Sequence, residues 1–174
     1  IFSLHKSFTF ETPWGLSNGL TYNEILERFE ENYKKDLDNW YESDVEGRNL
    51  VVLQTQYILD IFKQKWLLDD NVTKIDKEEL QIARSKLQTA QSSMYDLLIR
   101  LDLTYDQKDY LRMLMLSLDH QMNEINVLLD HPFYTRTTLK RVFGNLEQSY
   151  TVLFSVYRSF YASSVQSPPN FSRN

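Results

Sequence analysis

Apolar residues recur every three or four positions through most of the chain, which is the spacing of one face of an α-helix. The pattern is clearest between residues 76 and 102, where steps of three and four alternate as in a knobs-into-holes seam. The residues of this stripe are Leu80, Ala83, Leu87, Ala90, Met94, Leu97 and Leu101. Its small alanine side chains are expected to let a neighbouring helix approach closely.

Capping residues and prolines indicate where the helices begin and end. The pairs with capping-box spacing are Thr21 with Glu24, Asp76 with Glu79, and Thr104 with Gln107. Pro132 ends a helix because the residue before a proline is pushed out of the α region. The predicted helices cover residues 21–41, 44–69, 76–102, 105–130 and 135–163. Because the connections are short, we expect an all-α, up-and-down antiparallel bundle of five long helices over residues 21–163.

The two ends of the chain lack helical spacing. In residues 1–20 apolar and polar side chains alternate with a period of two, and a turn signal follows. The apolar positions are Phe2, Leu4, Phe8, Phe10 and Trp14. We expect an extended N-terminal arm that either lies in a groove between helices or docks onto another chain. Residues 164–174 are predicted to form a flexible C-terminal tail.

The composition is that of one globular domain, with 174 residues of which 42% are hydrophobic and 25% charged. Eleven Tyr and ten Phe predict a core or an interface built from large flat groups. The chain is acidic, with a net charge of -5, and its Lys and Arg are dispersed among acidic residues. Nucleic-acid binding is not expected, because it needs a basic stripe. No apolar run reaches the roughly twenty residues of a transmembrane segment.

The chain contains no cysteine, which excludes disulfides, thiolate metal sites and cysteine nucleophiles. It begins with Ile1 rather than Met, so a signal peptide, a membrane anchor upstream of residue 1 and a simple sequence boundary are open alternatives. The compartment stays open. The missing Met and the lack of cysteine favour an extracytoplasmic or organelle-lumen setting over the cytosol.

Two of the three histidines lie in the segment from residue 118 to residue 133. His120 and Glu124 are one helical turn apart and could share a metal ion. His131 lies eleven residues from His120, about 16 Å along a helix axis, which is too far for both to bind one ion. We therefore interpret the segment as an ordinary helix that ends at Pro132, and we expect neither a metal nor a cofactor.

Motifs that would indicate an enzyme are missing from the sequence. It has no Glu-x-x-His pair for a di-metal bundle, no Gly-x-Ser-x-Gly turn and no phosphate-binding glycine loop. Asp60 lies at the edge of an apolar helix face, where a carboxylate could be buried with a raised pKa and act as an acid–base group. The favoured interpretation of Asp60 is structural, with the side chain in solvent or paired with a Lys or Tyr. We therefore predict that the chain is not an enzyme.

Two predicted helices carry more apolar residues than one buried face requires. Helix 44–69 is apolar on both sides, and helix 105–130 has apolar residues opposite its core stripe. Such helices are either central in the domain or covered by a partner. The candidate partner surface comprises Met113, Leu116, His120, Val127, Phe62 and Trp66.

The predicted function is a non-catalytic helical-bundle module for protein–protein interaction or scaffolding, binding another protein or a second copy of itself. It would suit the soluble part of an anchored or exported protein. The alternative is a small-molecule-binding or sensory helical domain with an apolar, aromatic-lined core pocket.

Overall fold

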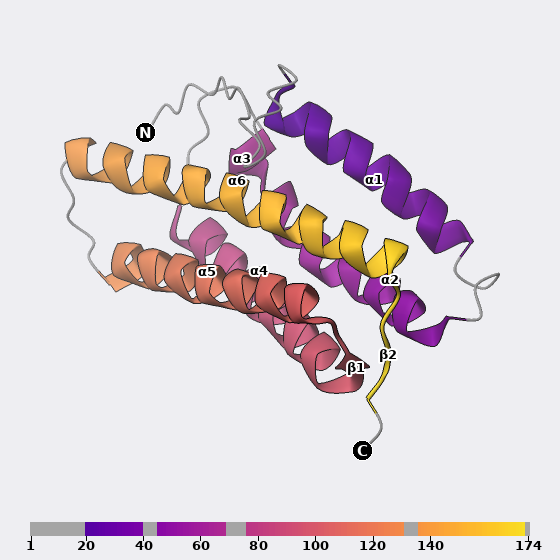
Figure 1. Cartoon of the computed structure of the whole chain (residues 1–174). Helices are drawn as coiled ribbons and strands as arrows, with labels where there is room; N and C mark the ends of the chain where they lie inside the picture. The colour runs from indigo at the N-terminus through magenta and orange to yellow at the C-terminus, as the bar shows by residue number, and fades with distance from the viewer. Residues whose placement is uncertain (1–19, 40–44, 69–75, 131–135, 173–174) are drawn as a thin grey trace.

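A computed structural model of the chain describes residues 20–39, 45–68, 76–130 and 136–172. Within these residues the chain forms an all-α, up-and-down antiparallel bundle, as predicted (Figure 1). The elements are α1 (Tyr22–Asp38), α2 (Glu46–Leu59), α3 (Lys65–Leu68), α4 (Lys77–Arg100), β1 (Leu101–Asp102), α5 (Tyr105–Asp130), α6 (Arg136–Gln166) and β2 (Asn170–Phe171). The predicted arm residues Phe2, Leu4, Phe8, Phe10 and Trp14 lie outside the described residues, as does His131.

The three predicted capping boxes are confirmed. The hydroxyl of Thr21 accepts the N–H of Glu24 at 3.3 Å, and the Glu24 carboxylate accepts the N–H of Thr21 at 2.7 Å. The same reciprocal bonds join Asp76 with Glu79 and Thr104 with Gln107. Each box satisfies backbone donors that have no partner within the helix, so these helix starts are determined locally.

The core lies between α2, α4, α5 and α6, and the apolar stripe of α4 points into it. Every residue of the predicted stripe is buried: Leu80, Ala83, Leu87, Ala90, Met94, Leu97 and Leu101. On α5 the residues Leu111, Leu114, Leu118 and Ile125, spaced as one face of a helix, have no exposed surface. The helical periodicity of the sequence therefore identifies the buried faces of α4 and α5.

The predicted single helix 44–69 is broken in the structure. α2 ends at Leu59, a 3₁₀ turn covers Asp60–Lys63, and Gln64 has an extended backbone before α3 begins. On a straight helix, positions 61, 62, 66 and 67 would span more than half of the circumference and could not share one face. The break allows all of them to be buried, namely Ile61, Phe62, Trp66 and Leu67. The bundle therefore has six α-helices in the described residues, not five.

Aromatic rings join α1 to the bundle. Phe29 packs edge-on against Phe154, Tyr157 and Tyr161 of α6, with ring centroids 5.6, 6.1 and 5.1 Å apart. Nearer the start of α1, Tyr22 packs against Phe154 with centroids 5.6 Å apart. Tilted and edge-on ring pairs stabilise beyond the area they bury. Aromatic residues thus form much of the contact between α1 and α6.

Part of the predicted C-terminal tail is packed against the bundle. α6 continues to Gln166, and Asn170 and Phe171 then pair antiparallel with Asp102 and Leu101. The Ser172 N–H donates to the Arg100 carbonyl at 2.9 Å, and the Arg100 guanidinium lies over the Phe171 ring. The segment 167–172 therefore lies beside the end of α4 and the first turn of α2 (Figure 1).

Candidate functional site

The structure divides the predicted partner surface into two groups. Met113, Leu116 and Val127 on α5 are exposed by 48, 65 and 47%, and His120 on the same helix is also exposed. Phe62 and Trp66 are instead buried in the core, with 0 and 5% exposure. Their assignment to a surface is therefore wrong. The break at Gln64 turns both rings inward, where Phe62 packs on Phe154 and Trp66 on Tyr150.

The exposed apolar surface of α5 continues onto α4. Tyr95 and Ile99 of α4 are exposed by 49 and 68%, and Tyr105 at the start of α5 is exposed by 81%. The sequence contains a signal for them, since both α4 residues lie outside the buried stripe on the helical wheel. They were missed because polar residues separate them from other apolar positions on that side of α4.

Polar contacts mark the register in which α4 and α5 run beside each other. The Gln91 side-chain amide donates to the Asp119 carboxylate at 2.7 Å, and Lys108 lies 3.9 Å from Asp102. In this antiparallel register Tyr95 lies level with residue 115 on α5. A surface groove of about 370 Å³ runs between the two helices. It is lined by Tyr95, Leu98, Lys108, Arg112, Met115, Leu116 and Asp119.

The charged residues at this groove are only loosely paired within the chain. Arg112 lies 3.9 Å from Asp109 and its side chain is 72% exposed. Lys108 is also 3.9 Å from its carboxylate partner, which is itself 74% exposed. Exposed ion pairs of this kind contribute little to stability. The two cations can therefore turn toward a bound partner at little cost to the fold.

A second groove, of about 390 Å³, lies between α2, the turn after it, and α4. Its lining residues are Gln56, Tyr57, Asp60, Ile82, Ser85, Lys86 and Thr89. The Asp60 carboxylate here is 52% exposed and lies 3.2 Å from the Lys86 ammonium. This is the structural interpretation that the sequence favoured for Asp60. The contact gives no support for a buried acid–base group at this position.

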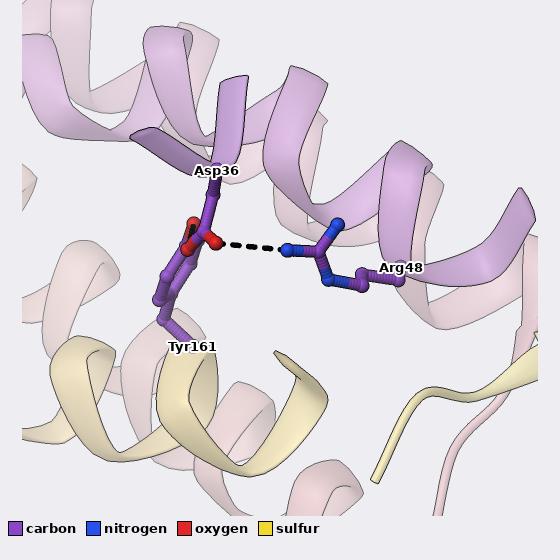
Figure 2. Close-up of polar contacts among 3 residues, drawn as sticks. All are labelled: Asp36, Arg48 and Tyr161. Carbon is purple, nitrogen blue, oxygen red and sulfur yellow. Dashed lines mark hydrogen bonds and ion pairs between the residues drawn. The ribbon is translucent and has the colours of Figure 1, made fainter. Parts of the chain in front are cut away.

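A cluster of polar side chains joins three helices (Figure 2). Asp36 of α1 lies between Arg48 of α2, at 2.8 Å, and the hydroxyl of Tyr161 of α6, which donates to it at 2.7 Å. Burial, followed by the bond and the charge of Asp36, raises the pKa of Tyr161 above its ordinary value. Both carboxylate oxygens are occupied, so this cluster fastens the end of α1 to the bundle.

Buried tyrosines in the core are also held in the protonated form. Burial raises the pKa of Tyr157, whose hydroxyl lies 2.6 Å from the Thr55 hydroxyl. Thr55 donates its own hydrogen to the Val51 carbonyl at 2.7 Å, so Tyr157 is the donor in the bond between the hydroxyls. This bond ties α6 to α2 inside the core. It has no contact with either groove.

Among the described side chains, no group of three or more His, Asp or Glu residues is arranged to hold a metal ion. Both His120 and Glu124 are on α5, as expected, and His131 lies outside the described residues. None of the described helices is both long and apolar enough to cross a membrane.

The α4–α5 groove and the exposed apolar residues beside it are the strongest candidate site on the described surface. Comparison with known proteins adds no relative from which a function could be transferred. Protein-family models, curated proteins and solved structures all give no match to this chain.

Proposed function

We propose that this chain is a non-catalytic helical-bundle module for protein–protein interaction, and that a protein partner docks on the outer face of α4 and α5. One observation carries the proposal: α4 and α5, whose groove is lined by Tyr95 and Leu116, bear large apolar side chains with exposures of 48 to 81%. They are Tyr95, Ile99, Tyr105, Met113 and Leu116. Exposed apolar patches rimmed by polar residues are typical of protein-binding surfaces.

The shape of the site favours a macromolecular partner over a small molecule. The groove runs along the surface between two helices of 24 and 26 residues, where another helix can lie along it. Tyrosine and arginine are enriched at the energetic centres of protein interfaces, and Tyr95 and Arg112 both line the groove. An apolar segment that carries carboxylates would complement both the apolar side chains and the cations that line the groove.

The polar residues of the bundle support a non-catalytic role. Asp36 is paired with Arg48 and Tyr161, one on each carboxylate oxygen, and Asp60 is exposed beside Lys86. The tyrosines with altered pKa values have them raised, so they stay protonated and cannot act as bases near neutral pH. These groups stabilise contacts between helices, and they lie outside the α4–α5 groove.

Site-specific photo-crosslinking tests the proposal. A photoreactive amino acid such as benzoylphenylalanine would replace Leu116 in one variant and Val152 of α6, which is 54% exposed, in a control variant. In cells that produce the protein, we expect a discrete covalent adduct from position 116 and none from position 152. The adduct should disappear when Tyr95→Asp is added. Equal adducts at both positions, or no adduct at position 116, would contradict the proposal.

A further inference from the structure

On the exposed face of α5, a positively charged residue lies on one side of the central residue along the helix axis, and a negatively charged residue lies on the other side. Leu116 lies near the middle of α5 (Tyr105–Asp130). Arg112 lies about 6 Å before it along the helix axis, and Asp119 about 4.5 Å after it. At 100° per residue, both are turned by roughly 40–60° from Leu116 toward the same side, the side that faces α4. Both residues line the α4–α5 groove.

We propose that this face binds a second copy of the same chain, with the two α5 helices antiparallel about a two-fold axis beside Leu116. The proposal rests on the proposed function and names the partner. In a two-fold interface, residue i of one copy meets residue j of the other, and j meets i. An axis at position 116 places position 112 opposite position 120. Arg112 therefore approaches Asp119 of the second copy, and this ion pair forms twice.

The remaining residues of the face are compatible with the same axis. Tyr95 on α4 lies level with residue 115. Tyr95 and Leu116 therefore lie near the two-fold axis, where a residue meets the same residue of the second copy, and both side chains are uncharged. On the other side of α5, Asp109 lies about one helical turn from His120 of the second copy. Farther out, the ring of Tyr105 comes opposite the aliphatic side chain of Val127. The charged residues closest to the two-fold axis, Arg112 and Asp119, therefore face residues of opposite charge.

The contacts within one copy leave the ion-pairing groups free to form these bonds. Arg112 is 3.9 Å from Asp109 and 72% exposed, so its guanidinium can exchange this weak contact for a shorter one. Asp119 receives a hydrogen bond from Gln91 through one carboxylate oxygen. A carboxylate accepts several hydrogen bonds, so it can also receive the guanidinium of a second copy.

A charge swap tests the pairing in the whole chain. Sedimentation equilibrium across a range of protein concentrations should show a monomer–dimer equilibrium. Arg112→Asp alone and Asp119→Arg alone each place like charges across the axis, and we expect each to raise the dimer Kd by roughly tenfold or more. The combined variant Arg112→Asp/Asp119→Arg restores the opposite pair and should recover most of the affinity. Circular dichroism would establish that each variant is folded.

Ile82→Asp, on the other groove, is the matched control and should leave the dimer unchanged. A monomeric chain at every concentration, or a combined variant that is no better than the single ones, would overturn the two-fold pairing. The crosslinking experiment separates the two proposals. An adduct from position 116 with a different protein, together with a monomeric chain, would leave the proposed function standing and reject self-association. No adduct and no dimer would reject both.

Discussion

Gln107 and Gln121 occupy equivalent positions on α5, two heptads apart, and both are completely buried. Gln107 donates to the Ser163 and Ser167 carbonyls at the end of α6, at 3.3 and 3.0 Å, and accepts the N–H of Thr104. Among the described residues, Gln121 has no hydrogen-bond partner for either atom of its side-chain amide. The same residue type at the same helix position therefore has opposite consequences for stability.

Replacing each glutamine by leucine should separate these consequences. Gln107→Leu removes hydrogen bonds that join α5 to α6, and we expect the free energy of unfolding to fall by about 2–3 kcal/mol. Gln121→Leu removes a buried amide without partners, and we expect no loss and a gain of about 1 kcal/mol. Urea unfolding of both variants measures the difference. Equal losses would show that Gln121 is as well satisfied as Gln107.

Two glycines offer a matched test of how the C-terminal segment packs. A Cβ atom on Gly47 of α2 would collide with the backbone carbonyl of Pro169, whereas nothing lies within 4 Å of the same atom on Gly144 of α6. Gly47→Ala should therefore destabilise the chain by about 1–3 kcal/mol. Gly144→Ala should stabilise it by about 0.5–1 kcal/mol, because alanine is the better helix former. Thermal unfolding measures both effects.

Hydrogen exchange checks the cause of the Gly47→Ala effect. If the substitution displaces the segment after α6, the Ser172 amide, which is bonded to the Arg100 carbonyl, should exchange faster. The core amides of α4 should exchange in the same order, from fastest to slowest, as in the unmodified chain. A destabilised variant with unchanged exchange at Ser172 would contradict the assigned contact.

The carboxylate of Asp36 is predicted to hold the end of α1 in place. Asp36→Ala removes the partner of both Arg48 and Tyr161, and because these contacts are charge-assisted and partly buried, we expect a loss of about 2–3 kcal/mol. Asp38→Ala, on the exposed side of α1, should cost less than about 0.5 kcal/mol. Hydrogen exchange should show faster opening of α1 only in the first variant. Similar behaviour of the two variants would argue against this fastening role.

Alkaline pH should unfold the bundle cooperatively. Burial raises the pKa of five tyrosines above their ordinary value of 10.0, namely Tyr22, Tyr33, Tyr150, Tyr157 and Tyr161. The unfolded chain therefore loses these protons at lower pH than the folded chain does. Their contribution to stability is complete below about pH 10 and falls as the pH rises above that value. The part of the tyrosinate absorbance that comes from these five rings should therefore increase in step with the loss of helical circular dichroism.

Ionisation of the buried tyrosines in the folded chain would contradict the alkaline prediction. If these five side chains ionised while the helices stayed intact, tyrosinate absorbance would reach its full value before the circular dichroism changed. That result would mean that the ring hydroxyls reach water in the folded state. It would contradict the burial that raises their pKa values.

The sequence by itself determined the features that depend on neighbouring residues along the chain. The capping boxes at Thr21, Asp76 and Thr104 formed because each pair of side chains is only three residues apart. The buried stripe of α4 followed from its spacing, since one face of a helix must meet the core. For the same reason the exposure of Met113 and Leu116 on α5 could be predicted.

Only the tertiary structure decided the features that depend on which segments meet. No proline or glycine marks the break at Gln64. It is explained by the burial of Phe62 and Trp66 against rings of α6 that are far away in sequence. Similarly, the pairing of Leu101 with Phe171 joins two-residue segments that are too short to show any periodicity.

The candidate interaction surface combines both kinds of information. Leu116 was identified from the helical wheel of α5, whereas Tyr95 became part of the surface only through the register between α4 and α5, which the Gln91–Asp119 hydrogen bond marks. Periodicity shows which way a side chain points relative to its own helix. Which exposed side chains share a surface depends on the packing of one helix against another, and that is fixed only when the chain folds.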